Sequence, residues 1–376
     1  MYKIIKKIVY AMFFVLGLSG LTACGQKTDD VSGFADNKKV RYSQNFQSVA
    51  LSEAGIIKEN LSDGLIHLFT IDEGENMILC YDPNCRHIRA TEENPDSECM
   101  GALYVKYTRT SYYEGCIYFF LMDSIFSSKI YKMKTDGAGR VLVAELPFTF
   151  DIANCCIFNE DKLYYLAKIG KADELTNDVS VMTRMVEVNL LDGSYRFLTE
   201  ETEDLLMDAS MSENTLYLRL AKKSNGRQYG LRVNVETLEK DTFIDTEKWY
   251  DEYAFMYAYD NDSFFYIDWE TNSIGIRNVD GTIEKVLLEG AEGEKFGWPI
   301  VSCDGLFYER TIEYGDESIG YYFLDFITGE VTNITDEQAA YGLVGYDGYY
   351  DAFIGYDEDN NVTMWSKEKV LGEAKK

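Results

Sequence analysis

The sequence predicts an all-β fold of the β-propeller type, and three observations lead to this prediction. A short unit, made of a turn pair, one variable residue, an apolar residue and an aromatic residue, recurs seven times along the chain. Asp-Gly or Thr-Gly pairs follow the second strand of several units, where hairpin turns need residues that accept positive φ. Helical periodicity is nearly absent. Small antiparallel sheets that repeat with a period in the forties bury their faces by packing in a ring.

The first 23 residues are predicted to be an export signal. Three lysines precede an apolar run of 14 residues from Ile8 to Leu21. A membrane-spanning helix needs about 20 apolar residues, so this length suits the apolar core of a signal peptide. The residues before Cys24 resemble the lipobox at which bacterial lipoprotein signal peptides are cut. This resemblance implies that Cys24 becomes the mature N-terminus and carries a lipid. An ordinary signal peptide with a cysteine at its end is the alternative.

Residues 24–45 are expected to form the lipid-bearing cysteine and a flexible tether, which places the folded part at the extracytoplasmic face of a bacterial cell membrane. The chain has a net charge of −28, and loss of the three signal-peptide lysines makes it −31. Nucleic-acid binding needs a basic surface and is therefore excluded. An acidic chain is not attracted to an anionic membrane, so the lipid must anchor it. We interpret the charge as a soluble, self-repelling surface rather than as a site for cations or a basic partner.

Residues 46–376 are predicted to form a single propeller domain, because no linker and only four prolines interrupt the repeats. Seven units predict seven blades. Six or eight blades are the alternatives, since the last unit is short and departs from the aromatic pattern. The units recur at intervals of 43 to 53 residues. Their turn pairs are Asp63-Gly64, Glu114-Gly115, Glu160-Asp161, Glu213-Asn214, Asn261-Asp262, Asp304-Gly305 and Asp347-Gly348.

The predicted ring needs a closing strand, because the last unit ends near Leu371 and is one strand short. The segment from Phe46 to Lys58 precedes the first unit and is apolar enough to supply that strand. We therefore expect it to pair into the last blade. The chain also contains 29 tyrosines and 21 phenylalanines, which favour strands. We expect them to pack between strands rather than to form a surface that stacks on sugars.

One segment of the first unit concentrates side chains that bind metals. Cys80, Cys85, His87 and Cys99 lie within 20 residues, and the chain has only two histidines. Thiolate and imidazole suit tetrahedral sites, and a Cys₃His set would complete a structural zinc site. The single residue between Cys85 and His87 is tighter than most zinc sites use. A disulfide is the second interpretation, because export permits one, and free thiols are the third. Four further cysteines are expected to be small buried residues: Cys116, Cys155, Cys156 and Cys303.

The loop Cys80-x-x-Pro83-x-Cys85-x-His87, behind a lipobox and ahead of such repeats, resembles a group of uncharacterised propeller lipoproteins of Gram-positive gut anaerobes. The resemblance spans nearly the whole mature chain, and the loop is its specific part. It implies a propeller fold and a lipid anchor, and it implies no activity. An anaerobic habitat, if it carries over, makes disulfides less favourable and strengthens the metal interpretation.

The sequence contains none of the common catalytic motifs: no Gly-x-Ser-x-Gly elbow, Walker loop, dinucleotide fingerprint or His-Glu-x-x-His. We therefore expect a monomeric, non-enzymatic binding or scaffold module, whose unknown protein or glycan ligand sits at one mouth of the ring or in its channel. One alternative is an exported carbohydrate-active hydrolase or lyase that uses paired carboxylates. The other is a metal- or redox-responsive surface protein built on the Cys/His loop.

Overall fold

The structure is a computed structural model, and its strands account for almost all of the regular secondary structure. No helix in the described part of the chain is both long enough and apolar enough to cross a membrane. Cys24, the predicted signal peptide and most of the predicted tether lie outside that part. It comprises residues 41–43, 49–52, 55–60, 63–70, 75–91, 94, 97–103, 108–124, 126–150, 156–172, 179–243, 253–268, 271–297, 300–301, 305–312, 317–325, 328–334, 345–347, 352–356, 362–366 and 371.

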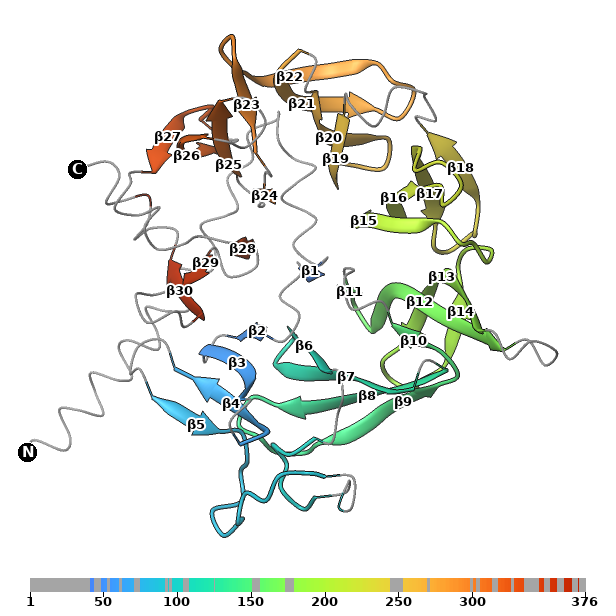
Figure 1. Cartoon of the computed structure of the whole chain (residues 1–376), viewed down its shortest axis with the longest axis vertical. Helices are drawn as coiled ribbons and strands as arrows, with labels where there is room; N and C mark the ends of the chain where they lie inside the picture. The colour runs from blue at the N-terminus through green and yellow to red at the C-terminus, as the bar shows by residue number, and fades with distance from the viewer. Residues whose placement is uncertain are drawn as a thin grey trace, which may run out of the picture.

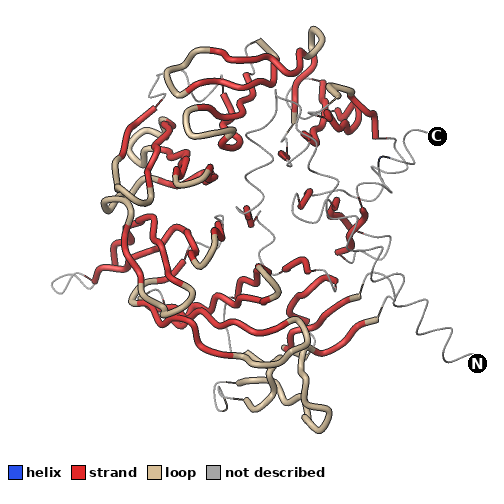
Figure 2. The backbone as a smooth tube through the Cα atoms, turned by 180° about the vertical axis from the view of Figure 1, so that it is seen from behind, coloured by secondary structure: helices blue, strands red, loops and turns tan. Residues whose placement is uncertain are grey.

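The described strands form seven antiparallel sheets that follow one another along the chain and lie around a central axis (Figures 1 and 2). The first sheet contains β2 (Val49–Ser52), β3 (Gly55–Asn60), β4 (Leu65–Phe69) and β5 (Asn76–Ile78). The second contains β6 (Thr108–Tyr113), β7 (Cys116–Ser124), β8 (Ser127–Lys134) and β9 (Val141–Leu146). The third contains β1 (Arg41–Ser43), β10 (Thr149–Phe150), β11 (Cys156–Asn159), β12 (Lys162–Ala172), β13 (Val179–Asn189) and β14 (Tyr195–Phe197).

Four sheets complete the series, and the arrangement is all-β and propeller-like, as the repeats predict. The fourth sheet contains β15 (Leu205–Ser212), β16 (Thr215–Ala221), β17 (Gln228–Asn234) and β18 (Lys240–Phe243). The fifth contains β19 (Tyr253–Ala258), β20 (Ser263–Asp268), β21 (Ser273–Asn278) and β22 (Ile283–Glu289). The sixth contains β23 (Glu294–Phe296), β24 (Ile300–Val301), β25 (Gly305–Ile312), β26 (Glu317–Asp325) and β27 (Val331–Ile334). The seventh contains β28 (Gly345–Asp347), β29 (Ala352–Tyr356) and β30 (Val362–Ser366).

In three of the sheets the repeated turn pair is a two-residue hairpin turn between neighbouring strands. In the second, third and fourth sheets the residues that flank the pair are register partners, for example Tyr113 with Cys116. The first residue of the pair has positive φ, with values of 46° at Glu114, 52° at Glu160 and 46° at Glu213. Hairpin turns of this kind match the right-handed twist of the strands that they join, which explains the turn pair at these three positions.

The core lies between neighbouring sheets rather than within one sheet. Five hydrophobic clusters each combine residues of two successive sheets, from the first and second to the fifth and sixth. In the cluster between the second and third sheets, Phe120 meets Phe150, Phe158 and Tyr165 with ring centroids 5.9 to 6.5 Å apart. A single sheet cannot bury both of its faces, so this pairwise packing stabilises the ring.

The aromatic residue of the repeated unit belongs to this core. Tyr118, Tyr164, Tyr217, Phe265 and Tyr308 are all at most 6% exposed. Burial raises the pKa of each of these tyrosines above its ordinary value, because the ionised phenolate would lose its hydration. The expectation that the aromatics pack between strands is confirmed at these positions.

The predicted closing strand joins a different sheet from the one expected. Within the segment from Phe46 to Lys58, the described residues form β2 and most of β3, which pair with each other and, through β3, with β4 of the first sheet. The prediction that this segment pairs into the last blade is therefore wrong. The segment is apolar enough for either sheet edge, and β3 is taken up as the partner strand of β4. In the described part of the chain β30 touches β3 without pairing to it.

One strand from the N-terminal side reaches across to the third sheet. β1 lies at the end of the range expected to be a tether, and it pairs with β11, where Ser43 is the register partner of Cys156. Figure 1 shows β1 close to the central axis. β1 therefore adds a strand at the inner edge of the third sheet.

Candidate metal centre

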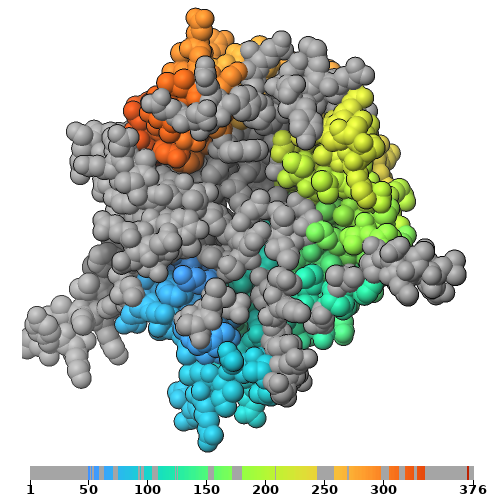
Figure 3. Space-filling model, in the orientation of Figure 1, coloured from blue at the N-terminus to red at the C-terminus, as the bar shows by residue number. Residues whose placement is uncertain are grey.

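The four predicted ligand residues converge in the structure. After β5 the chain leaves the first sheet and returns to it near Ala102, and this excursion, which we call the metal-ligand loop, projects from the outer edge of the ring (Figures 1 and 3). Cys80 lies at its start, Cys85 and His87 in its first turn, and Cys99 near its end. The three sulfur atoms and one imidazole nitrogen all lie within 4.8 Å of one another. The four residues named from the sequence are therefore ones that the structure brings together.

A tight turn brings Cys85 and His87 towards Cys80. The amide of Cys85 donates to the carbonyl oxygen of Asp82 at 3.1 Å, and the Asp82 carboxylate accepts from the amide of Asn84 at 2.8 Å. His87 adopts a φ of 51°, and its amide donates to the Cys85 sulfur at 3.4 Å. A positive φ is uncommon for a residue other than glycine. The left-handed backbone of His87 therefore accompanies the short Cys-x-His spacing of this cluster.

Cys99 is held from the opposite side of the cluster. The Ser97 hydroxyl donates to the carbonyl oxygen of Ile88 at 2.6 Å and accepts from the Cys99 amide at 3.3 Å. The chain then returns to β4, because the Ile66 amide donates to the carbonyl oxygen of Gly101 at 2.8 Å. Ala102 also forms an isolated β-bridge with Leu65. The loop is thus ordered at both of its ends by the first sheet.

The geometry of the cluster fits a tetrahedral metal ion. With Zn–S bonds of about 2.3 Å and Zn–N bonds of about 2.0 Å, a tetrahedral site places sulfur and nitrogen ligands roughly 3.6 Å apart. The Cys99 sulfur lies 3.7 Å from Nδ1 of His87. The four residues could therefore hold a metal ion, and all four positions around it would be filled by protein ligands.

The two end cysteines of the cluster differ in how easily their thiols ionise. Cys99 is 1% exposed, and burial raises the pKa of its thiol to about 12. Burial also opposes ionisation of Cys80, but backbone hydrogen bonds from Asp82 and Met100 outweigh it and lower the pKa of that thiol. Metal binding needs thiolates, and a bound cation supplies the charge that stabilises them. The described cysteines are all free in the structure, and none is joined to another in a disulfide.

The other predicted positions lie elsewhere. Cys156 is a buried residue of β11 and Cys116 a half-buried residue of β7, both at the cluster between the second and third sheets. Cys155 and Cys303 lie outside the described residues. The second histidine, His67, is a buried residue of β4, with Nε2 2.8 Å from the Asp63 carboxylate and Nδ1 2.5 Å from the Asn76 amide oxygen. His67 therefore links the turn before β4 to β5 and does not join the metal cluster.

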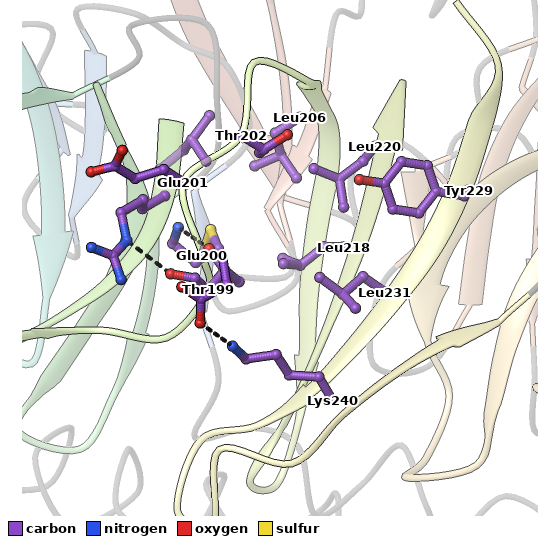
Figure 4. Close-up of a pocket in the computed structure, with 13 residues that line it drawn as sticks. Thr199, Glu200, Glu201, Thr202, Leu206, Leu218, Leu220, Tyr229, Leu231 and Lys240 are labelled. Atoms are coloured by element: carbon purple, nitrogen blue, oxygen red, sulfur yellow. Dashed lines mark hydrogen bonds and ion pairs between the residues drawn. The ribbon is translucent and has the colours of Figure 1, made fainter. Parts of the chain in front are cut away.

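A pocket of about 180 Å³ lies between the third and fourth sheets (Figure 4). At its mouth Lys240 lies 3.4 Å from the Glu200 carboxylate, and Glu201 forms an ion pair with Lys171. Both of these acids line the pocket, and each lies beside a lysine. Its apolar lining consists of Leu166, Met185, Leu206, Leu218, Leu220 and Leu231.

The comparisons with known proteins concern the fold. No protein-family model matches the chain, and no curated protein matches it. Among solved structures, a complexed mutant of puromycin hydrolase is similar with a TM-score of 0.51 and 10% identity, over 92% of this chain and 55% of that one. TolB from Acinetobacter baumannii is similar with a TM-score of 0.42 and 12% identity, over 85% of this chain and 76% of that one. The chain spans about half the length of puromycin hydrolase. At 10% identity, the similarity to puromycin hydrolase shows the fold alone.

The structure also places residues beside the cluster that sequence reasoning missed. Arg140 and Gly137 belong to the turn between β8 and β9 of the second sheet, and both contact the metal-ligand loop. The Asp136-Gly137 pair is visible in the sequence as a turn. Nothing in the sequence indicates that it packs against Leu79 and Cys80, because that contact exists only when two sheets pack side by side.

Proposed function

We propose that this protein is a lipid-anchored, seven-bladed propeller that acts as a binding or scaffold module at the extracytoplasmic face of the membrane, and that Cys80, Cys85, His87 and Cys99 hold a structural zinc ion. The carrying observation is the closed Cys₃His set. Catalytic zinc sites keep one position open for water or substrate, whereas structural sites use four protein ligands. The clustered chemistry of this chain is therefore of the kind that orders a loop.

Zinc is supported by the ligand types and by their distances. Three sulfurs and one imidazole within 4.8 Å suit a soft, tetrahedral ion. The loop that carries them has no strand of its own between β5 and β6 in the described residues, so the metal would supply the order that strand pairing supplies in the other sheets. Structural zinc sites contribute folding free energy in this way.

Elemental analysis of protein purified without chelator tests the metal site. We expect about one equivalent of zinc per chain, and loss of that equivalent in Cys99→Ser. Cys116→Ser is the matched control, because Cys116 is a described free cysteine outside the cluster. Absence of stoichiometric metal from the wild-type protein would contradict the proposal. Thiols that then react only after reduction would establish the disulfide instead.

The binding role is supported by the surroundings of His67 and of the two acids at the pocket mouth. His67 is buried between Asp63 and Asn76, and the carboxylates at the pocket mouth are paired with lysines. A non-enzymatic module should bind a cell-wall or plant polysaccharide, or a surface protein, without changing it. Pull-down of such polymers and chromatography of the recovered polymer test this role. Turnover of any of them would replace the binding proposal with the hydrolase or lyase alternative.

The anchor proposal rests on the sequence around Cys24. Full-length protein expressed in a Gram-positive host should partition into the detergent phase of a Triton X-114 extract, and it should incorporate a radiolabelled fatty acid. Cys24→Ala should abolish both signals while leaving the fold intact. Equal partitioning of the two proteins would refute the lipid anchor.

A further inference from the structure

The neighbouring second sheet forms hydrogen bonds with the loop of the proposed metal site. Arg140 lies in the connection between β8 and β9, and its Nη1 donates to the carbonyl oxygens of Cys99 at 3.1 Å, Met100 at 3.0 Å and Ala102 at 2.5 Å. Its Nη2 donates to the carbonyl oxygen of Ser97 at 3.3 Å. One guanidinium from the second sheet therefore binds four carbonyl oxygens on the segment that carries Cys99.

The same turn also touches the other end of the loop. Gly137 has a φ of +79°, and a Cβ built on it would lie 2.6 Å from the Cys80 nitrogen and 2.7 Å from the Leu79 carbonyl carbon. Glycine alone allows the turn to lie this close to the backbone of Leu79 and Cys80. The turn therefore contacts both Cys80 and the segment of Cys99, which are the first and last metal ligands in the chain.

The turn is itself well fixed to the second sheet. The Gly137 amide donates to the carbonyl oxygen of Lys134 at 3.0 Å, and the Lys134 amide donates to that of Ala138 at 3.0 Å. The Asp136 carboxylate accepts from the Ala138 amide at 2.9 Å. A rigid turn holds its partners at constant positions, so it can position the loop even before a metal binds.

The contact between the second and third sheets explains the position of the loop between the first and second. In the third sheet, the turn at Gly193 approaches the second sheet in the same way, and a Cβ there would lie 2.3 Å from the carbonyl oxygen of Val143. Val143 belongs to β9, the outermost strand of the second sheet. By the same contact, Leu79 and Cys80 occupy the place that an outermost strand takes in the neighbouring sheet.

Charge also favours Arg140 at this place. A zinc ion with three thiolates and a neutral imidazole has a net charge of −1, since two positive charges meet three negative ones. The Arg140 guanidinium donates to the carbonyl oxygen of Cys99, so it brings a positive charge to the edge of the site. Outer groups that orient and balance metal ligands commonly contribute about 10- to 100-fold to metal affinity.

We propose that the metal centre is a staple between the first and second sheets, and that Arg140 and Gly137 are its positioning residues. This inference rests on the proposed structural metal. Binding linkage is reciprocal, so a turn that strengthens metal binding must itself be stabilised by the metal to the same extent. Metal binding in the first sheet should therefore stabilise the β8–β9 turn of the second sheet.

Competition with a chromophoric chelator tests the positioning residues. Arg140→Gln should weaken zinc binding about 10- to 100-fold while still taking up one equivalent at saturation. The zinc affinity of Arg140→Lys should lie between those of Arg140→Gln and the wild type. Lysine keeps the positive charge but lacks the two donor nitrogens of the guanidinium. The control is Arg196→Gln, since Arg196 also reaches across to a neighbouring sheet, at the carbonyl oxygen of Val235, and lies away from the metal. Arg196→Gln should bind zinc as the wild type does.

The two glycines of the turn give a second matched pair. Gly137 and Gly139 both have positive φ, but a Cβ on Gly139 would meet nothing within 4 Å. Both alanine variants carry the same kind of backbone strain, and Gly137→Ala alone disturbs Cys80. Gly137→Ala should therefore weaken zinc binding by about 10-fold or more, and Gly139→Ala should leave it unchanged. Equal effects of the two variants would overturn the role of the turn.

Hydrogen exchange provides a readout at a distance from the ligands. Removal of zinc from the wild-type protein should speed exchange in residues 136–140 as well as in the loop. In Arg140→Gln the effect should be confined to the loop. A wild-type protein that binds one equivalent of zinc, with unchanged affinity in Arg140→Gln and no response in residues 136–140, would refute the staple and leave the structural metal standing. A wild-type protein that binds no metal would refute both.

Discussion

Replacement of Glu187 by glutamine should weaken the contact between the third and fourth sheets and lower the free energy of unfolding. Glu187 is a 5% exposed residue of β13. Its carboxylate accepts from Arg196 at 3.0 and 2.7 Å and from Lys162 at 3.1 Å. Arg196 also donates to the carbonyl oxygen of Val235, which follows β17 of the fourth sheet, at 2.6 Å. The carboxylate therefore holds in place the arginine that joins the two sheets.

The expected loss of unfolding free energy depends on how far each side chain of the ion pairs is buried. Removal of one member of a fully buried ion pair costs about 3–5 kcal/mol, whereas an exposed pair contributes about 0–1 kcal/mol. The Glu187 side chain is 6% exposed, but those of Arg196 and Lys162 are 43% and 37% exposed. Solvent screens the two cations, so Glu187→Gln should lower the free energy of unfolding by about 2 kcal/mol.

The same pair makes a pH prediction. Burial by itself raises the pKa of Glu187, but the hydrogen bonds and charges of Arg196 and Lys162 outweigh it, so this pKa lies below its ordinary value. A carboxyl whose pKa is lower in the folded state stabilises the protein above its unfolded pKa, of about 4.3, and loses that contribution as pH falls through the folded pKa. The difference between the wild type and Glu187→Gln should therefore be constant from about pH 6 to 8 and shrink below about pH 4.3.

Urea denaturation followed by far-ultraviolet circular dichroism, at about pH 7 and about pH 3.5, measures both quantities. Glu200→Gln is the control, because Glu200 forms an ion pair with Lys240 at 3.4 Å and its side chain is 90% exposed. That variant should change stability by less than about 0.5 kcal/mol. Two results would show that the ion pairs of Glu187 do not stabilise the fold. One is an equal unfolding free energy for Glu187→Gln and the wild type at neutral pH. The other is a difference between them that does not shrink in acid.

Three further predictions concern the turns and the core. Glu160→Asn should raise the free energy of unfolding by about 0.5–1 kcal/mol in the same urea assay, because Glu160 is exposed at a φ of 52° and asparagine adopts positive φ more readily; a loss of stability would contradict the positive φ at this position. Gly193→Ala should cost about 2–3 kcal/mol, because a Cβ there would lie 2.3 Å from the carbonyl oxygen of Val143, whereas Gly281→Ala, with positive φ and open space, should cost only about 1 kcal/mol; similar losses would refute the close approach. Phe120→Ala should cost about 3–5 kcal/mol, because Phe120 is fully buried against Phe150, Phe158 and Tyr165, and a midpoint near that of the wild type would show that the second and third sheets do not share this core.

The repeats could be read from the sequence because each hairpin is a local structure. A pair such as Glu114-Gly115 must adopt positive φ wherever two strands are joined by two residues, so the requirement appears in the chain itself. The aromatic partners, for example Tyr217 and Tyr308, mark the strand that follows each turn. The closing strand was misassigned for the complementary reason. Strand pairing of β2 and β3 with β4 is decided by competition among sheet edges, and the segment from Phe46 to Lys58 is apolar enough for either edge.

The ligand set was also a local signal, but its surroundings were not. Cys80, Cys85 and His87 lie in one short segment, and Cys99 follows only twelve residues after His87. Soft ligand types within so short a segment indicate a metal site through residue type and spacing alone. The contacts of Arg140 cross 38 to 43 residues of sequence, and a lone arginine after an Asp-Gly turn carries no sign of its acceptors.

The sequence by itself determined the features that depend on neighbouring residues: the all-β class, the repeated hairpins, the burial of their aromatic residues and the identity of the four metal-ligand candidates. The tertiary structure decided which sheet each free strand joins, which side chains of one sheet hold the loop of the next, and that the acids at the pocket mouth are paired. Hairpin turns and ligand spacings are set by a few consecutive dihedral angles. Contacts between sheets depend on how whole faces pack, and packing assembles residues whose distance in the chain carries no information about their distance in space.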